Sequence, residues 1–159
     1  MTAAHRIGIG FDAHRFAPGR ALVLGTIAID HPEGLAGHSD GDVLSHAITD
    51  AILGAAGGGD IGARFPSSDA RWLDAESIVF LNDVVAWVRL SGYQILSIDA
   101  TVICEQPRLE PYRQKIQDAL ADATGAAHAS VKATTTDGMG FTGRNEGIAA
   151  IAVALLESK

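Results

Sequence analysis

A carboxylate and an imidazole stand two positions apart near the N-terminus. Residues 6–16 alternate apolar and other side chains with a period of two, which predicts a β-strand. Asp12 and His14 then share one face of that strand and converge on one point, as metal ligands do. The opposite face carries the apolar residues Ile7, Ile9 and Phe11. An Asp-x-His pair taken alone also fits a surface turn or a simple hydrogen-bonded pair.

A second cluster of polar side chains lies at the start of a predicted helix. The run 38–42 reads His-Ser-Asp-Gly-Asp, and apolar residues at helical spacing predict a helix from about Asp40 to Ala56. Asp42, His46 and Asp50 follow at intervals of four, so this helix carries one narrow polar stripe.

These two features together allow a metal site. If the stripe faces the strand, Asp12, His14 and His46 supply three nitrogen and oxygen ligands and leave a fourth position open, as catalytic zinc requires. Asp50 or Asp42 could then orient His46 from behind. On spacing alone, the alternative is that His46 bonds a neighbouring carboxylate in a helix surface patch.

Three loops also carry polar groups. Residues 60–69 combine hydroxyls, carboxylates and glycines, which fits a substrate loop or an ordinary solvated connection. Residues 132–137 end a strand with three threonines and a carboxylate, although threonine is also common in strands. The glycine-rich loop 138–147 could hold an anion with backbone N–H groups and Arg144, but it lacks the Walker spacing. The run 8–10 lacks the third glycine of a dinucleotide fingerprint.

The elements that must position these groups form a mixed pattern. Further helices are predicted at 74–90 and 111–124, and further strands at 21–24, 27–29, 93–104 and 131–136. Pro32, Gly34 and Gly37, which disfavour regular secondary structure, predict a loop over 31–37. The segment 148–156 fits a helix by its alanines and a strand by its alternation. Helices and strands alternate without a strict βαβ rhythm, so the fold class is α/β with helices packed on a sheet.

Length and composition set the class of protein. A chain of 159 residues, 47% hydrophobic and 19% charged, can bury one core, which predicts a single domain over 1–159. Its only cysteine, Cys104, excludes an internal disulfide and a cysteine-based zinc site. No apolar run has membrane-spanning length, and residues 1–6 lead into a strand without a signal-peptide core. We therefore expect a cytoplasmic protein that does not enter a membrane.

The net charge constrains the partners. Twelve Lys and Arg against nineteen Asp and Glu give −7, without a basic run, so nucleic acid is not an expected partner. A small anionic substrate would need local cations or helix N-termini to offset this field.

Taken together, the motifs have a known counterpart. Residues 8–16, 37–42, His46, 60–62, 65–66, 132–136 and 140–141 resemble, in order and over nearly the full length, the 2-C-methyl-D-erythritol 2,4-cyclodiphosphate synthase family. The resemblance implies a phosphorus-oxygen lyase of the non-mevalonate isoprenoid pathway. The 2-phosphate of 4-diphosphocytidyl-2-C-methyl-D-erythritol 2-phosphate would attack the β-phosphorus and release CMP, which closes the cyclic diphosphate.

The resemblance also assigns roles to residues. It implies that Asp12, His14 and His46 hold one Zn²⁺ per subunit, and that a second divalent ion, Mg²⁺ or Mn²⁺, lies opposite Asp137. It implies that His38 and Thr135 stabilise the transition state. The implied substrate-binding residues are Asp12, His14, His38, Ser39, Asp60, Ile61, Gly62, Phe65, Pro66, Ser67, Ser68, Asp69, Cys104, Glu105, Gln106, Pro107, Arg108, Leu109, Glu110, Thr134, Thr135, Thr136, Asp137, Phe141 and Arg144.

The resemblance implies an assembly as well as a fold. The fold would be α/β of the α+β type, with helices on one side of a mainly four-stranded mixed sheet and 148–156 as a strand. The assembly would be a homotrimer with active sites between subunits, zinc ligands on one chain and cytidine contacts on the next. Phe141 and Arg144 match a pocket on the trimer axis that can hold an isoprenoid diphosphate.

Two positions depart from the family pattern. Asp137 replaces the more common Glu, and this shorter side chain would reach a second metal through water. Arg108 replaces Lys, so a planar guanidinium stands in place of the point charge of an ammonium group.

Two alternative functions share the metal site: a non-catalytic trimeric metal-binding scaffold, and a zinc hydrolase that cleaves phosphodiesters to linear products.

Overall fold

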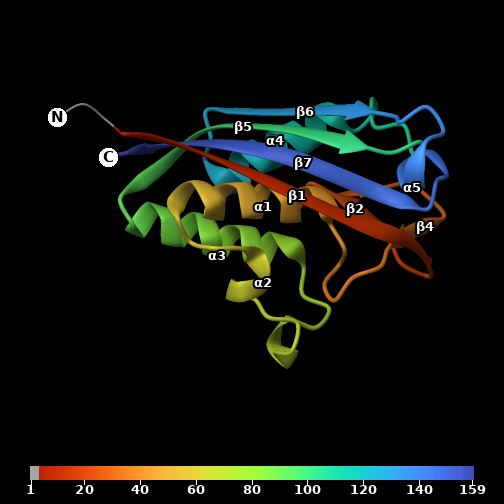
Figure 1. Ribbon diagram of the computed structural model, residues 1–159, viewed down its shortest axis with the longest axis horizontal. Coiled ribbons are helices and arrows are strands. Elements are labelled where there is room, and N and C mark those ends of the chain that lie inside the picture. The colour runs from red at the N-terminus through yellow and green to blue at the C-terminus, as the bar shows by residue number, and fades with distance from the viewer. Residues whose placement is uncertain (1–3) are drawn as a thin grey trace.

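The computed structural model describes residues 4–159, and a five-stranded mixed sheet is its centre (Figure 1). Residues 1–3, part of the N-terminus expected to lack a leader, lie outside the described residues. The sheet order is β4-β1-β7-β5-β6. Its strands are β1 (His5–Pro18), β4 (Glu33–Leu35), β5 (Tyr93–Ile103), β6 (His128–Thr134) and β7 (Gly147–Ser158). A separate antiparallel pair is formed by β2 (Leu22–Leu24) and β3 (Ile27–Ile29).

The helices are α1 (Val43–Ala56), α2 (Ile61–Arg64), α3 (Ser77–Leu90), α4 (Arg113–Thr124) and α5 (Gly140–Gly143), with a short 3-10 helix at Ala70–Trp72. The long helices α1, α3 and α4 pack against the sheet, and α1, α2 and α3 lie below it in Figure 1. The core lies between the layers, where apolar residues such as Leu44, Ile52, Leu81 and Val84 are fully buried. Within residues 4–159, no helix has the length and apolar character needed to cross a bilayer.

Helix α1 packs directly on the backbone of β1. A Cβ atom placed on Gly8 would lie 2.0 Å from the carbonyl oxygen of Ala51, and one on Gly10 would lie 1.9 Å from that of Ala47. Both distances are far below van der Waals contact, so only glycine permits this approach. The helix-facing side of β1 continues from these glycines to Asp12 and His14, which brings both side chains beside α1.

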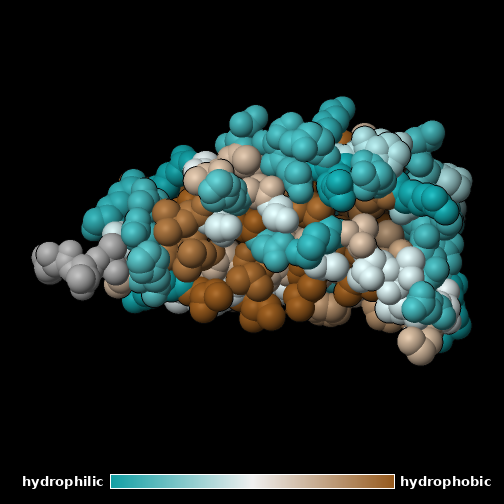
Figure 2. Space-filling model, turned by 90° about the horizontal axis from the view of Figure 1, so that it is seen from above, coloured by the Kyte–Doolittle hydropathy of each residue, from teal (hydrophilic) through white to brown (hydrophobic). Residues whose placement is uncertain are grey.

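The opposite face of the sheet is apolar and open. Ile7, Ile9 and Phe11 of β1 are 72%, 66% and 59% exposed, and they pair across the strands with Leu155, Val153 and Ile151 of β7. Figure 2 shows hydrophobic surface gathered in the middle of the molecule seen from above the sheet. Exposed apolar patches flanked by polar residues are typical of surfaces that bind another protein, a membrane or a ligand.

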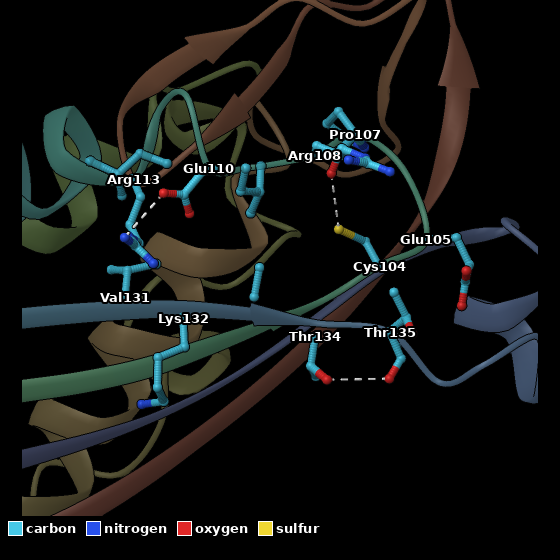
Figure 3. Close-up of a pocket in the computed structure, with 13 residues that line it drawn as sticks. Cys104, Glu105, Pro107, Arg108, Glu110, Arg113, Val131, Lys132, Thr134 and Thr135 are labelled. Carbon is cyan, nitrogen blue, oxygen red and sulfur yellow. Dashed lines mark hydrogen bonds and ion pairs between the residues drawn. The ribbon is translucent and has the colours of Figure 1, made fainter.

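Strands β5 and β6 run parallel and end at the same edge of the sheet. Their register pairs Ile103 with Thr134, and the N–H of Cys104 donates to the carbonyl of Thr134 at 3.0 Å. The chain segments that follow both strands therefore lie side by side, as Figure 3 shows. This edge gathers the second group of residues for which the sequence predicts a function.

The predicted elements are confirmed with shifted ends, and the ambiguous last segment is the strand β7. The mainly four-stranded sheet is present as β1, β7, β5 and β6, and β4 adds a short fifth strand. The prediction of a loop over 31–37 is wrong for Glu33–Leu35. These residues form β4, whose backbone pairs with the end of β1 despite the neighbouring Pro32 and the glycine at position 34. The loops predicted over 60–69 and 138–147 contain the one-turn helices α2 and α5, which are too short for a periodic signal.

Candidate active site

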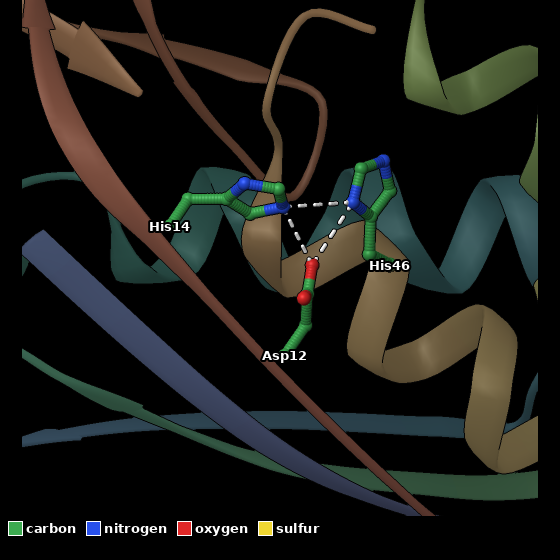
Figure 4. A group of neighbouring side chains, drawn as sticks. All are labelled: Asp12, His14 and His46. Carbon is green, nitrogen blue, oxygen red and sulfur yellow. Dashed lines mark hydrogen bonds and ion pairs between the residues drawn. The ribbon is translucent and has the colours of Figure 1, made fainter. Parts of the chain in front are cut away.

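Three side chains from two elements meet beside the N-terminal half of α1. Asp12 and His14 project from β1, and His46 projects from the first turn of α1 (Figure 4). The Oδ2 atom of Asp12 lies 2.8 Å from Nε2 of His14 and 3.0 Å from Nδ1 of His46, and the two nitrogens are 3.3 Å apart. The stripe on the predicted helix therefore faces the strand, and the surface-patch interpretation of His46 is wrong.

The donor set suits a metal ion. Ligands about 2.0–2.1 Å from a tetrahedral zinc ion stand about 3.3 Å from one another, and the three contacting atoms here are spaced at 2.8–3.3 Å. The ligand atoms of Asp12, His14 and His46 all lie within 4.8 Å of one another, and the side chains are half-buried. One carboxylate and two imidazoles on one side of an ion leave room for a further ligand on the other.

The charges at this site support one another. Burial disfavours the charged carboxylate of Asp12, but hydrogen bonds and charge from His14 and His46 outweigh it and hold the pKa of Asp12 well below its usual value. Burial likewise works against a charged His14, but the hydrogen bond and charge of Asp12 raise its pKa above 6.5. Asp12 is therefore ionised at neutral pH, which is the state that a metal ligand needs.

The groups behind His46 differ from those predicted. Nε2 of His46 lies 2.8 Å from Oγ of Ser77 and 3.1 Å from Oγ of Ser39. Asp42 does not orient His46, because its carboxylate accepts hydrogen bonds from the β2–β3 turn and from the first turn of α1. Asp50 does not orient it either, because its carboxylate accepts from the N–H of Ile61 at 2.7 Å.

A cavity of about 240 Å³ opens over the three side chains. Several residues predicted from the sequence line it, namely Asp12, His14, His38, Ser39, His46, Ile61, Gly62, Phe65 and Ser67. Asp60, Pro66, Ser68 and Asp69 are not among its lining residues, and the carboxylates of Asp60 and Asp69 instead cap the short helices that follow them. Trp72 and Phe80 also line the cavity. Sequence reasoning missed Phe80 because an aromatic residue in a helical pattern indicates a core position, and it missed Trp72 because this residue follows the predicted loop without a motif of its own.

Arg20 fixes the loop that carries His38. This residue follows β1, and its guanidinium donates hydrogen bonds to the carbonyl of Gly37 at 3.0 Å and to the carbonyl of Ser39. The side chain of His38 is exposed toward the cavity, while Ser39 is buried. The sequence analysis missed Arg20, because an isolated arginine after a Pro-Gly turn carries no motif.

A second cavity, of about 270 Å³, lies between the ends of β5 and β6 (Figure 3). Its predicted lining residues are Cys104, Glu105, Pro107, Arg108, Leu109, Glu110, Thr134 and Thr135, and the structure adds Arg113, Ile116, Val131, Lys132 and Ala133. Three of these side chains, Arg108, Arg113 and Lys132, are cationic, and two, Glu105 and Glu110, are acidic. Arg113 is paired with Glu110 and Lys132 with Asp99, so the cavity offers an anion only a small excess of positive charge. Gln106, Thr136 and Asp137 are not among the lining residues of this cavity.

The two residues that the resemblance places at the transition state lie in different cavities of this chain. His38 lines the cavity over the three candidate ligands, whereas Thr135 lines the cavity between β5 and β6. The hydroxyl of Thr135 donates to the carboxylate of Asp137 at 3.1 Å. No residue lines both cavities, so one chain does not bring the two halves of the predicted site together.

A third, shallower hollow lies where β1 meets the loop before β7. Phe141 lines it with His14, Arg15 and Glu146. Arg144 is not among its lining residues, and its Nε donates to Glu146 at 2.7 Å.

The fold and the candidate metal centre together define an α/β enzyme with a three-residue metal site. The chain belongs to the YgbB family, whose family model matches residues 5–157. It is 52% identical over 153 residues to a 2-C-methyl-D-erythritol 2,4-cyclodiphosphate synthase of Moorella thermoacetica, covering 95% of this chain and 94% of that one. It is 50% identical to the synthase of Salinibacter ruber, covering 96% of this chain and 99% of that one.

Solved structures share the fold. A structure described as an IspF CDP complex of Plasmodium falciparum superposes with a TM-score of 0.86 at 31% identity, covering 98% of this chain and 97% of that one. The sheet with helices on one side and the family resemblance read from the motifs are therefore confirmed.

Proposed function

We infer that this protein is a lyase that converts 4-diphosphocytidyl-2-C-methyl-D-erythritol 2-phosphate to 2-C-methyl-D-erythritol 2,4-cyclodiphosphate, with release of CMP, in non-mevalonate isoprenoid biosynthesis. The family membership gives the reaction, since relatives about half identical over nearly the whole length carry this name. The structural observation that supports this reaction is the convergence of Asp12, His14 and His46 beneath a cavity that His38 and Ser39 also line.

The reaction is an intramolecular phosphoryl transfer. An oxygen of the 2-phosphate forms a bond to the β-phosphorus, the bond from that phosphorus to the bridging oxygen breaks, and CMP leaves with the electron pair. Two anionic groups must approach each other, so positive charge and alignment are needed more than a strong base. Holding both reacting groups of one folded substrate in alignment contributes up to about 7–11 kcal/mol in well-oriented systems.

The candidate metal ligands set where charge is neutralised. Asp12, His14 and His46 would hold a Zn²⁺ ion, for which the spacing of their donor atoms is suitable. When bound, the ion supplies a Lewis acid for a phosphate oxygen. A second divalent ion, Mg²⁺ or Mn²⁺, is proposed near Asp137, whose carboxylate already accepts a hydrogen bond from Thr135. Phosphate oxygens and water would complete its coordination.

The protein groups around the reacting phosphates then bind and orient them. His38, exposed in the cavity, would donate a hydrogen bond to oxygens whose charge grows in the transition state. Thr135 would do the same from the other side with its hydroxyl. Ser39, Asp60 to Gly62 and Phe65 to Asp69 are proposed to bind the methylerythritol phosphate part. Cys104 to Glu110 with Thr134 to Asp137 are proposed to bind the cytidine and diphosphate.

An active site between subunits reconciles the two cavities. We propose a homotrimer in which the metal cavity of one chain faces the β5–β6 cavity of its neighbour. His38 and Thr135, which line different cavities of one chain, would then meet across the interface. The open apolar face formed by Ile7, Ile9 and Phe11 supplies a surface for such an interface.

The hollow beside β1 is a proposed regulatory site on the trimer axis. Phe141 in its lining offers an apolar contact. Arg144 does not line the hollow, but its guanidinium is bonded to the lining residue Glu146 and would turn to a bound diphosphate. Farnesyl diphosphate should raise the melting temperature of the parent, and Arg144→Ala should abolish that rise. An unchanged melting temperature of the parent would exclude this ligand.

The remaining expectations concern extent and location. The family match over residues 5–157 supports a single domain spanning 1–159. The scarcity of cysteine and the lack of a membrane-spanning helix among the described residues support a cytoplasmic enzyme.

The reaction is tested by ³¹P NMR of the purified protein with 4-diphosphocytidyl-2-C-methyl-D-erythritol 2-phosphate, Zn²⁺ and Mg²⁺. A coupled pair of cyclic-diphosphate signals growing in step with CMP is expected. CMP accompanied only by linear phosphates would identify a hydrolase instead. Unchanged substrate with a fully metallated protein would identify a metal-binding scaffold.

A further inference from the structure

Two polar side chains lie behind His46, on the side away from Asp12. Ser77 is the first residue of α3 and is fully buried. Asp40 lies in the loop before α1. Neither residue is among those that line the cavity over the candidate ligands, so neither is placed to touch the substrate.

The hydrogen bonds of Asp40 fix the direction of the chain of contacts. Its carboxylate can only accept, and it accepts from the N–H of Asp42 at 3.0 Å and from the N–H of Ser77 at 3.0 Å. It also accepts from the hydroxyl of Ser77. The single hydroxyl proton of Ser77 is therefore directed to Asp40, and the Ser77 oxygen is left as an acceptor.

That direction determines which ring nitrogen of His46 carries the proton. Oγ of Ser77 lies 2.8 Å from Nε2 of His46, so Nε2–H donates to Ser77. Nδ1 is then left with its lone pair, and it is the atom that faces Asp12 at 3.0 Å and His14 at 3.3 Å. The hydroxyl of Ser39, 3.1 Å from Nε2, is a second and longer contact of the same nitrogen.

We propose that Asp40 and Ser77 are positioning residues that hold His46 as the Nε2–H tautomer, with Nδ1 presented to the metal. This inference rests on the proposed metal site. The device is a carboxylate–hydroxyl–imidazole chain, in which the carboxylate acts on a metal-binding histidine through an intervening serine. The chain also ties the N-terminal end of α3 to the loop before α1, so His46 is aligned by a second helix as well as by its own.

The test is the affinity of the protein for Zn²⁺ alone, measured by competition with a zinc-chelating dye. Partners that orient metal-binding histidines contribute about 10–100-fold to metal affinity, so Ser77→Ala should raise the dissociation constant for Zn²⁺ by about that factor. Ser77→Thr keeps a hydroxyl and should restore most of the affinity. The visible spectrum of the Co²⁺-loaded protein gives a second readout, which should change in Ser77→Ala and return toward that of the parent in Ser77→Thr.

Thr124→Val is the matched control. Thr124 is also a buried hydroxyl with two backbone contacts, but it lies at the end of α4, away from the metal site. The substitution Thr124→Val should lower the free energy of unfolding without changing the affinity for Zn²⁺. Asp40→Asn provides an independent variant, since an amide cannot accept all three hydrogen bonds, and it should also weaken Zn²⁺ binding.

The outcomes separate this inference from the proposed function. A parent that binds Zn²⁺ and a Ser77→Ala variant that binds it within twofold would overturn the positioning role and leave the function standing. A parent that binds no Zn²⁺ would overturn both. Equal losses in Ser77→Ala and Ser77→Thr would also overturn the positioning role, because the hydroxyl would then not be the group that matters.

Discussion

Arg20 holds the backbone on both sides of His38. Its guanidinium donates one hydrogen bond to the carbonyl of Gly37 and one to the carbonyl of Ser39, the residues immediately before and after His38. A planar fork with two parallel donors suits this task, because it fixes the spacing and orientation of two acceptors at once. The proposed contact of His38 with the reacting phosphates therefore depends on a residue that lines neither cavity.

Arg20→Ala should lower kcat by about 10–100-fold, because a displacement of about 1 Å in a catalytic group costs rates of that order. The kcat of Arg20→Lys should lie between that of Arg20→Ala and that of the parent, because one ammonium group cannot hold both carbonyls equally. Steady-state kinetics and Zn²⁺ content provide the measurement, and Zn²⁺ binding should be unchanged. Arg89→Ala is the control, because Arg89 also donates to a backbone carbonyl, that of Thr124, remote from both cavities. Equal activities of Arg20→Ala and Arg89→Ala would refute the role of Arg20.

His46→Ala should lose Zn²⁺ and activity together. This change removes one of the three converging donors, which leaves Asp12 and His14 as an incomplete set. Metal content after dialysis against a weak chelator, measured by elemental analysis, checks the first effect. His128→Ala removes an exposed histidine of β6 and should leave the metal content unchanged. One Zn²⁺ per chain retained by His46→Ala would contradict the proposed ligand set.

Asp42→Asn should lower the free energy of unfolding by about 1–3 kcal/mol. The carboxylate is completely buried and accepts from the N–H groups of Gly25, Thr26 and Ser45 and from the hydroxyl of Ser45. Burial raises the pKa of Asp42, and the four hydrogen bonds oppose that rise. An amide nitrogen in place of one oxygen would face N–H donors and leave them unpaired.

Urea unfolding of the metal-free protein gives this free energy directly. Asp122→Asn removes the same charge from an exposed position on α4 and should change the unfolding free energy by less than about 0.5 kcal/mol. If both variants unfolded at the same urea concentration, the loss of a negative charge would explain the change in stability, and the hydrogen bonds of Asp42 would not.

Cys104 should resist thiol reagents in the native protein. Burial, with a smaller contribution from the charge of Glu105, raises the pKa of its thiol from 9.0 to about 11. Only the thiolate reacts, so at pH 8 the reactive fraction is about 100-fold lower in the folded than in the unfolded chain. Below pH 11 the native rate should rise about tenfold per pH unit. Colorimetric disulfide exchange in native and urea-unfolded samples measures both rates, and similar rates at pH 8 would disprove the shift.

Ile9→Asp should dissociate the proposed trimer and abolish activity without unfolding the chain. Ile9 is 66% exposed at the centre of the open apolar face, so a charge there is solvated in the monomer and buried only on assembly. Val79→Asp is the control, because Val79 is also exposed, at 46%, but lies on α3. Sedimentation equilibrium measures the mass, and an unchanged mass for Ile9→Asp would exclude this face as the interface.

The candidate metal ligands were predictable from the sequence because part of their geometry is local. Asp12 and His14 share a face by the period of a strand, and His46 follows from the spacing of a helix. What brings the two elements together is the pair Gly8 and Gly10, whose packing role has no periodic signal. The family resemblance supplied that relationship, since the spacing of Asp12 and His46 along the chain says nothing of their distance in space.

The groups behind the ligands were not predictable in this way. Asp42 and Asp50 have the right spacing to reach His46, but the backbone N–H groups of a turn and of a short helix compete for their oxygens. Ser77 reaches His46 from a helix 31 residues further along the chain. Such a contact depends on how α3 packs against α1, which amphipathic spacing does not specify to the level of one side chain.

The glycine at position 10 makes the candidate metal centre depend on the distance between β1 and α1. It lies two residues before Asp12, and the carbonyl that a side chain there would strike belongs to Ala47, the residue after His46. The space that one methyl group would fill thus separates the strand and the helix that carry the three candidate ligands. Gly10→Ala would push β1 and α1 apart and increase the distances between Asp12 or His14 and His46, so the spacing of the candidate ligands depends on a residue without a side chain.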